Sequence, residues 1–160
     1  MKEILREVGM IARCFETISN IEFKEYNLEK GQYLYLVRIC ENPGIIQERV
    51  AELLKVDRTT AARAIQKLTA EGFVNKVRDL KNKKIWKLHP SEKGKTIHAF
   101  LQKEEAYSNE IALKNLSLPE QKTLLSLLRR VRENIEVDWE LVKKGEKRQY
   151  LKDPGFPDEI

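Results

Sequence analysis

The fold is decided by residues 56–74, which read VDRTTAARAIQKLTAEGFV. Asp57 is a suitable N-terminal cap, because its carboxylate can accept hydrogen bonds from the free amides of a first helical turn. Gly72 suits the left-handed conformation that ends many helices. Between them, helical spacing gathers small and apolar side chains on one face: Ala61, Ala64, Ile65 and Leu68. These residues predict an amphipathic helix over residues 57–71.

The opposite face of this helix is polar and suits the reading of bases. Arg63 can pair bidentately with guanine, Gln66 can pair with adenine, and the Thr59 hydroxyl suits several base edges. Arg58 and Thr60 lie at the helix N-terminus, which favours phosphate. A polar face is also typical of an ordinary surface helix that binds nothing. The neighbouring segments are therefore needed to distinguish a DNA-reading helix from such a surface helix.

The segments on either side complete a winged helix-turn-helix. Residues 45–54 predict a short helix, and a three-residue turn joins it to the helix that begins at Asp57. Residues 73–77 and 85–88 are rich in β-branched and aromatic side chains and predict two strands. Residues 78–84 between them are polar and basic, which predicts a hairpin tip.

Positive charge is concentrated in the same region. The chain carries +5 overall, but residues 45–95 alone carry +7, from thirteen Lys and Arg against six Asp and Glu, and each flank carries −1. Such a block is expected of a surface that meets a polyanion, and a merely solvated lysine-rich face is the alternative. Because a basic tip and a polar helix flank one helix-turn-helix, DNA binding is favoured.

Helices are also predicted outside this lobe. The first carries an apolar stripe from Ile4 to Ile18, and a second is expected to begin at Asn27, with Asn42-Pro43-Gly44 ending it. Beyond the wing, Ser91 is expected to cap a helix that extends to about Asn115. A capping box at Ser117-Leu118-Pro119-Glu120 begins the last helix, Gly145 closes it, and an extended tail with Asp153-Pro154-Gly155-Phe156-Pro157 follows.

Three stretches carry a resemblance to a known family: residues 56–63, residues 68–74, and Ser91-Glu92-Lys93-Gly94 after the wing. They resemble the multiple-antibiotic-resistance-regulator (MarR) family in its general SlyA-like pattern. The resemblance implies a mainly α fold with a small β-wing, a winged helix-turn-helix flanked by N- and C-terminal dimerisation helices. The expected organisation is a single domain over 1–144, with a DNA-binding lobe at 28–90, dimerisation helices at 1–27 and 91–144, and a C-terminal tail at 145–160.

The resemblance implies a homodimeric transcription regulator with helix 57–71 in the major groove of a pseudo-palindromic operator and the basic wing 76–84 on the backbone or minor groove. The family's wing commonly carries Asp-x-Arg, whereas Asn82 and Lys84 stand at the matching positions here. The expected DNA contacts are Arg58, Thr59, Thr60, Ala62, Arg63, Gln66, Lys67, Lys76, Arg78, Lys81, Lys83 and Lys84.

Wide apolar stripes on the first and last helices favour self-association, and the resemblance implies release from DNA by a small aromatic or phenolic effector. A repressor is favoured, although the residues do not separate repression from activation. Two alternatives stay open: a winged helix that docks an acidic protein partner, and a thiol-based redox sensor acting through Cys14.

The sequence gives no positive sign of catalysis. No phosphate-binding glycine loop, nucleophile motif or metal-spaced Cys and His set is found, so neither an enzyme nor a cofactor or metal is expected. No run of eighteen apolar residues would form a membrane span, and two cysteines are too few for a disulfide scaffold. A cytoplasmic protein without a membrane partner is therefore expected.

Overall fold

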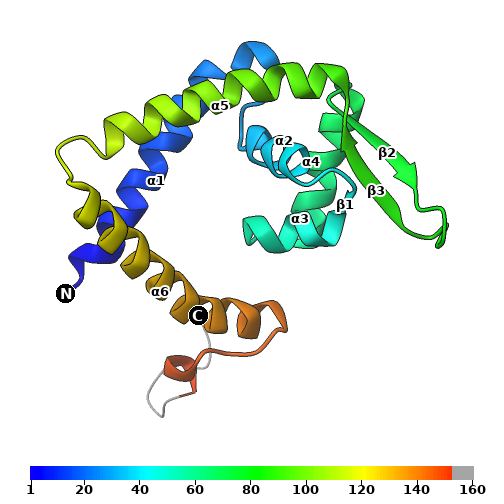
Figure 1. Cartoon of the computed structure of the whole chain (residues 1–160). Coiled ribbons are helices and arrows are strands. Elements are labelled where there is room, and N and C mark those ends of the chain that lie inside the picture. Colours follow the sequence, from blue (N-terminus) through cyan, green and yellow to red (C-terminus); the bar gives the residue numbers. More distant parts are fainter. Residues whose placement is uncertain (153–160) are drawn as a thin grey trace. The chain divides into compact units, whose positions relative to one another are not determined.

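The structure is a computed structural model that describes residues 1–152. The chain divides into two compact units: a first unit over Met1–Tyr107 and a second unit that begins at Ser108 (Figure 1). The elements are α1 (Glu3–Glu22), η1 (Lys24–Tyr26), α2 (Gln32–Glu41), β1 (Ile45–Ile46), α3 (Gln47–Leu54), α4 (Arg58–Ala70), β2 (Val74–Arg78), β3 (Trp86–Pro90), α5 (Glu92–Ala112), α6 (Leu118–Lys143) and η2 (Gln149–Leu151).

The core of the first unit lies where α2, α3 and α4 pack against a small sheet. The sheet is antiparallel in the order β1-β3-β2, and Leu88 at its centre pairs with Ile45 on one side and with Lys76 on the other. Fully buried side chains from α2, α3 and α4 close the core, among them Leu36, Val50 and Leu68. The expected mainly helical winged helix-turn-helix is confirmed.

The residues that predict α4 also form it. Asp57 accepts the amide N–H of Thr60 at 2.8 Å, and the chain after the helix turns at Gly72 with φ of 77°. The small residues Ala61 and Ala64 are buried with Ile65 and Leu68, which lets α4 lie close to its neighbours. The buried face of this helix is the one that the spacing predicts.

Two boundaries differ from the sequence prediction because tertiary pairing overrides local pattern. Asn27 does not cap α2: it adopts a left-handed conformation with φ of 57°, and α2 begins at Gln32. Ile45 and Ile46 are not helical, since they form β1 against β3 and the helix starts at Gln47. On α3, Leu53 is 40% exposed.

The N-terminus of α5 docks on the turn between α4 and β2. Ser91 caps the helix as predicted, because its Oγ accepts the amide N–H of Gly94 at 3.0 Å and donates to the carbonyl oxygen of Gly72 at 2.6 Å. Gly94 is buried, and a Cβ built on it would stand 2.3 Å from the carbonyl oxygen of Phe73. A side chain at this position cannot be accommodated without moving backbone.

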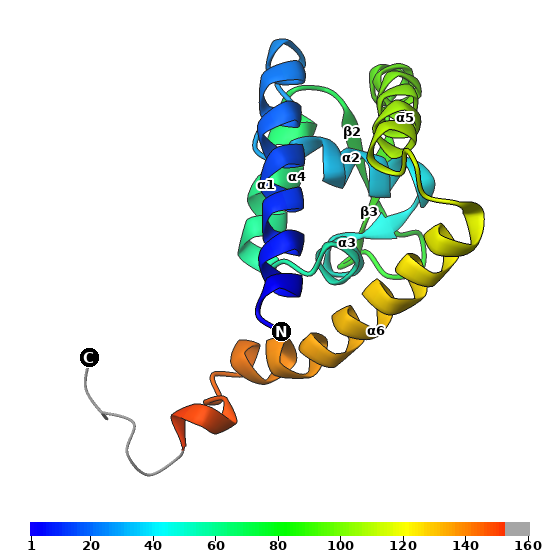
Figure 2. The ribbon, with the colours of Figure 1, turned by 90° about the vertical axis from the view of Figure 1, so that its left-hand side faces the viewer.

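The second unit consists of the end of α5, a turn and the long helix α6. The predicted capping box is present, with Ser117 donating its amide N–H to Glu120 at 2.7 Å, and α6 runs on as one continuous helix (Figure 2). None of the residues of α6 is buried, although many are apolar. The preceding helix ends at Ala112 rather than near Asn115, which turns the chain with φ of 69°.

The segment after Gly145 is not simply extended where the structure describes it. Residues 149–151 form the η2 turn, and Arg148 returns to α6 through an ion pair with Asp138 at 2.7 Å. The predicted stretch Asp153-Pro154-Gly155-Phe156-Pro157 lies outside the described residues. Among residues 1–152, no helix is both long enough and apolar enough to cross a membrane.

Candidate nucleic-acid interface

The outward face of α4 presents most of the predicted base-reading residues to solvent. Arg58, Thr59, Arg63 and Gln66 are exposed, on the side of the helix opposite its buried face. Ala62 is half-buried beside them. An exposed helix face with Arg, Gln and Thr can offer hydrogen bonds to base edges in a major groove.

Two predicted contact residues on α4 also hold the structure. The Thr60 hydroxyl donates to Asp57 at 2.5 Å, and this bond together with the Thr60 amide keeps the pKa of the Asp57 carboxyl below its usual range. Lys67 is half-buried and pairs with Glu29 at 3.3 Å. Both side chains therefore have partners within the protein.

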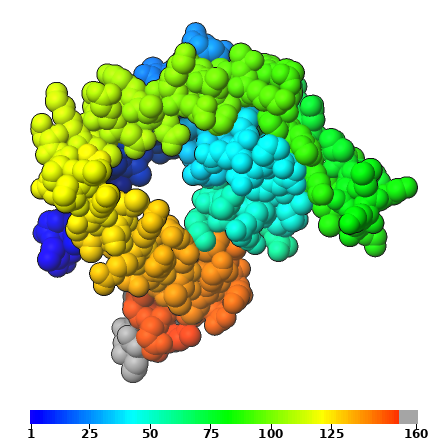
Figure 3. Space-filling model, in the orientation of Figure 1, coloured from blue at the N-terminus to red at the C-terminus, as the bar shows by residue number. Residues whose placement is uncertain are grey.

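The wing carries its lysines at an exposed tip. Lys81, Lys83 and Lys84 are all exposed in the loop between β2 and β3, and the hairpin projects from the rest of the first unit (Figure 3). On one side of the hairpin, Lys76 and Lys84 line a groove of about 410 Å³ together with Trp86. The structure thus gathers the predicted wing contacts on one projection.

Arg78 is a wing residue whose cation is already engaged within the protein. Its guanidinium lies over the ring of Trp86, 4.8 Å from the ring centroid, across the β2–β3 pair in which these two residues are register partners. A cation held over an indole face is stabilised by the ring quadrupole. Arg78 therefore stiffens the stem of the wing as well as adding positive charge to it.

Asp79 organises the loop that displays the lysines. Its Oδ1 accepts the amide N–H groups of Lys81 at 2.9 Å and Asn82 at 2.8 Å, and its Oδ2 pairs with Lys87 at 2.5 Å. The Lys87 ammonium and these amides keep the pKa of the Asp79 carboxyl below its usual range. Asn82 in turn accepts the amide N–H of Lys84 at 3.1 Å. These bonds fix the loop where an Asp-x-Arg pair is absent.

We predict that Asp79→Ala weakens binding to every DNA duplex about two- to tenfold, the net worth of a hydrogen-bonded interaction of this kind. Removing a negative charge beside DNA would by itself strengthen binding, so a loss identifies loop positioning. Asp79→Asn keeps the acceptor for Lys81 and Asn82 and is expected to bind at least as well as the wild type. Fluorescence-anisotropy titration measures both, and tighter binding by Asp79→Ala than by the wild type would refute the positioning role.

Other chemistry is sparse in the described part of the chain. No group of three or more His, Cys, Asp or Glu residues within 1–152 could hold a metal ion. Both cysteines are free; Cys14 is exposed, and burial of Cys40 raises the pKa of its thiol to about 11. A thiol with so high a pKa is a poor nucleophile. The redox role considered for Cys14 stays a prediction.

The pairings Glu29–Lys67, Asp79–Lys87 and Arg78–Trp86 were not predicted from the sequence. Arg78 and Trp86 are register partners in the hairpin, so a strand register derived from the loop length could have placed them opposite one another. The same register places Lys87 opposite Val77 and therefore diagonal to Asp79. The Glu29 pair joins segments 38 residues apart, and the sequence pattern carries no signal for it.

The exposed polar face of α4 beside a basic wing defines a winged helix-turn-helix DNA-binding protein. The sequence profile of the MarR family matches residues 28–86. The HTH-type transcriptional regulator YybA of Bacillus subtilis (strain 168) is 61% identical over 150 residues, which cover 94% of this chain and 100% of that protein. The chain belongs to the MarR family of transcriptional regulators.

Solved structures agree with this assignment. A MarR family regulator from Listeria monocytogenes, crystallised in complex with a 26-mer DNA, is 53% identical and gives a TM-score of 0.90, with 94% of this chain and all of that chain covered. The transcriptional regulator SlyA is 56% identical with a TM-score of 0.84, covering 87% of this chain and 98% of that one. The protein is a DNA-binding transcription regulator and not an enzyme.

Proposed function

We propose that this regulator binds a pseudo-palindromic operator as a homodimer, with α4 in the major groove and the wing on the backbone or minor groove. One observation carries the proposal: the first unit exposes Arg63 and Gln66 on α4 and three lysines on a projecting wing. The relative that was crystallised with a 26-mer DNA supports it by similarity. A two-fold dimer would place its reading helices about 34–36 Å apart, one turn of B-DNA.

Each predicted residue receives a role in this proposal. Arg63 and Gln66 read base edges, and Ala62 offers an apolar contact to a thymine methyl group. Arg58 and Thr59 hold phosphate at the helix N-terminus, where the helix dipole favours anions. The remaining residues contact or orient the DNA backbone or minor groove: Thr60, Lys67, Lys76, Arg78, Lys81, Lys83 and Lys84.

The proposed dimer is supported by apolar side chains on α1 and α6 that stay exposed to solvent in the single chain. On α1, Leu5 is 66% exposed and Ile11 is 54% exposed; on α6, Leu125 is 50% exposed and Ile135 is 50% exposed. Water-exposed apolar helix faces of this extent are a driving force for association, and a second copy supplies the matching surface. We assign α1, α5 and α6 to the dimer interface.

Control of DNA binding follows from a shift between two dimer conformations. In one conformation the spacing of the two α4 helices matches the operator, and in the other it does not. A small aromatic or phenolic effector binds better to the mismatched conformation and so lowers the fraction of dimers that fit the operator. The protein acts in the cytoplasm, because a transcription regulator must reach DNA. Repression, rather than activation, is the simplest outcome of operator occupancy.

Two measurements test the proposal against a protein-docking winged helix. Sedimentation equilibrium gives the mass of the particle, for which twice 18.8 kDa is expected. Leu128→Lys, which places a charge on the exposed face of α6, is expected to shift the mass toward one chain. Gel-shift titration with a random duplex at low salt distinguishes a DNA-binding protein from a protein-docking winged helix, since an adaptor for an acidic protein need not retard DNA. A lone subunit that ignores DNA would refute the proposal.

We expect Lys83→Ala to weaken binding to all duplexes alike and to lower the salt slope of log K by about one unit, because one fewer phosphate-bound cation is displaced. Lys122→Ala, on the exposed face of α6, is the matched control and should leave the slope unchanged. Titrations at several salt concentrations measure both variants. An unchanged slope for Lys83→Ala would exclude this lysine from the DNA contact.

A further inference from the structure

The chain leaves α4 through three consecutive residues whose backbone carbonyls accept hydrogen bonds from the start of α5. The Glu71 oxygen accepts from the Lys93 ammonium at 2.7 Å. The next two oxygens, of Gly72 and Phe73, accept from the Ser91 hydroxyl at 2.6 Å and from its amide N–H at 2.9 Å. Ser91 belongs to the cap of α5, but Lys93 is an exposed lysine with a long, flexible side chain. Its ammonium nevertheless lies on the end of α4.

Two features of this place favour a cation. Glu71 is the C-terminal cap of α4, and the C-terminal end of a helix carries the negative end of the helix dipole. The Lys93 ammonium also lies 4.1 Å from the centroid of the Phe73 ring, which is only 2% exposed and therefore fixed in the core. The face of an aromatic ring attracts a cation. Lys93 thus ties α5 to both ends of the short turn that follows α4.

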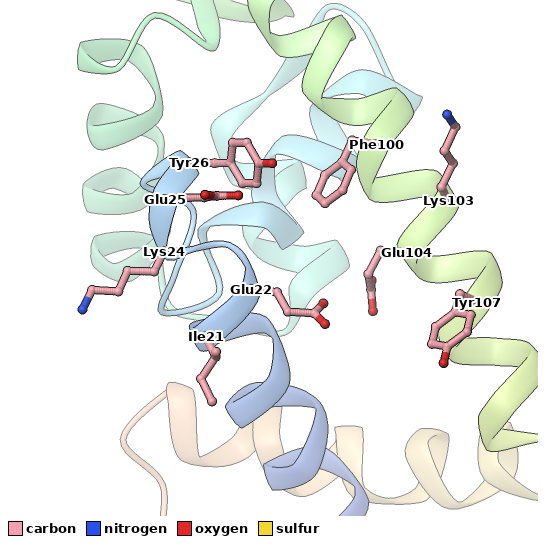
Figure 4. Close-up of a pocket in the computed structure, with 9 residues that line it drawn as sticks. All are labelled: Ile21, Glu22, Lys24, Glu25, Tyr26, Phe100, Lys103, Glu104 and Tyr107. Carbon is pink, nitrogen blue, oxygen red and sulfur yellow. The ribbon is translucent and has the colours of Figure 1, made fainter.

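Glu71 is held through its side chain as well. Its Oε2 accepts a hydrogen bond from Nδ2 of Asn27 at 3.1 Å. Asn27 directly follows η1, and η1 itself packs on α5, since the rings of Tyr26 and Phe100 stand 5.3 Å apart between centroids (Figure 4). The end of α4 is therefore braced from two sides, by α5 through Lys93 and by the η1 turn through Asn27.

These bonds bear on the direction in which α4 points. Apolar burial holds α4 against the core but is non-directional, whereas hydrogen bonds depend on distance and angle. With 13 residues α4 is about 20 Å long, so a tilt of about 5° at one end moves the other end by about 2 Å. A binding constellation has to be held to within about 0.5 Å. Bonds at the C-terminal end of α4 are therefore able to control how Arg63 is presented.

We propose that Lys93 is a positioning residue for operator recognition. Its ammonium fixes the C-terminal end of α4, so that Arg63 and Gln66 meet the base edges in register, and it does not itself contact DNA. This inference rests on the proposed function. A positioning cation differs from a phosphate-bound cation in what its removal does: loss of a phosphate contact weakens every duplex and lowers the salt slope of log K, whereas loss of positioning weakens the operator alone.

Lys93→Met is the principal test variant, because methionine keeps an unbranched apolar side chain beside Phe73 and removes the charge. Lys93→Arg keeps the charge and the donors. Lys95→Met is the matched control, since Lys95 lies on the same helix and pairs with Glu92 of α5 at 2.6 Å. Asn27→Gly removes the second brace without a change of charge, and glycine accepts the φ of 57° at this position. Thermal melting shows that each variant is folded.

Hydrogen–deuterium exchange tests the tie without DNA. The amide N–H groups of Glu71 and Phe73 donate to the carbonyl oxygens of Lys67 and Leu68, each at 2.9 Å, so their exchange requires the end of α4 to open. We expect Lys93→Met to speed this exchange about threefold to tenfold, the net worth of one hydrogen bond. Lys95→Met should leave it unchanged. The wild-type rate in Lys93→Met would overturn the proposal.

Fluorescence-anisotropy titrations with the operator and with a random duplex, at several salt concentrations, test the role in recognition. We expect Lys93→Met to weaken the operator about threefold to tenfold, with the random duplex changed less than about twofold and the salt slope unchanged. Lys93→Arg should bind both duplexes as the wild type does, and Asn27→Gly should weaken the operator selectively.

A salt slope lower by about one in Lys93→Met, or equal losses on the two duplexes, would make Lys93 a phosphate contact and overturn the proposal. A wild-type preference for the operator that survives intact in Lys93→Met would refute the positioning role alone. A wild type without any such preference would refute the proposed function, and the positioning role would fall with it.

Discussion

Arg63→Ala should cost about 1–3 kcal/mol of operator affinity while barely changing the affinity for an unrelated duplex. Arg63 is exposed on α4, three residues from Gln66 and on the same face, and its guanidinium can make two hydrogen bonds to one guanine. Losing both bonds removes discrimination at one base pair. Contacts to phosphates, which hold any duplex, stay in place.

Gln66→Ala should have an effect of the same size at an adjacent position of the operator, where an adenine is expected. For each variant, the quantity to compare with the wild type is the ratio of its affinity for the operator to its affinity for a random duplex. Fluorescence anisotropy in one buffer measures both affinities. Lys83→Ala is the comparison, since it should lower both affinities alike. If Arg63→Ala also lowered both affinities alike, the residue would be a phosphate contact and α4 would not read bases through it.

Gly94→Ala should destabilise the folded protein by about 1–3 kcal/mol, with Gly94→Val worse, because overpacking forces backbone to move. The added Cβ would meet the Phe73 carbonyl oxygen at 2.3 Å, and that oxygen also accepts the amide N–H of Ser91 at 2.9 Å. The clash therefore separates α5 from the turn that follows α4. Chemical denaturation of the wild type and of each variant measures the change.

Gly9→Ala is the matched control for this change. A Cβ on Gly9 would meet only the flexible end of the Arg13 side chain, at 3.2 Å, and Gly9 lies within α1. Alanine in a helix interior is worth about 0.5–1 kcal/mol relative to glycine, so this variant should be at least as stable as the wild type. Equal stability of Gly94→Ala and the wild type would show that α5 can move away from Phe73 without cost.

What the sequence predicts well in this protein is local. The α4 helix follows from a cap at Asp57 and a buried stripe that ends in Leu68, both set by residues within four positions of one another. The capping box at Ser117 is local for the same reason. The lysines of the wing are exposed as expected, because a short hairpin tip offers them no core to enter.

What the sequence predicts poorly depends on partners far along the chain. Ile45 and Ile46 continue a helical pattern, yet the edge of β3 supplies hydrogen bonds that draw them into the sheet. Asn27 is a good helix cap by type, but its side chain donates to Glu71, 44 residues away, and α2 starts later. The pairing of Lys67 with Glu29 is of the same kind, and it changes the role of a residue predicted to face DNA.

The same distinction applies to the candidate site. Residue type and helical period suffice to predict that Arg63 and Gln66 share the exposed face of α4. The acceptor that arranges the wing loop, Asp79, is identified only once its contacts to Lys81, Asn82 and Lys87 are known.

The most direct test of the account is the affinity of the purified protein for an operator selected from genomic fragments, compared with a scrambled duplex of equal length and composition. At one salt concentration near the physiological value, the operator is expected to bind about 10³-fold tighter or better. The footprint should cover two half-sites one helical turn apart. Equal affinity for the two duplexes, or no retardation of either even at low salt, would contradict a regulator that reads DNA through α4.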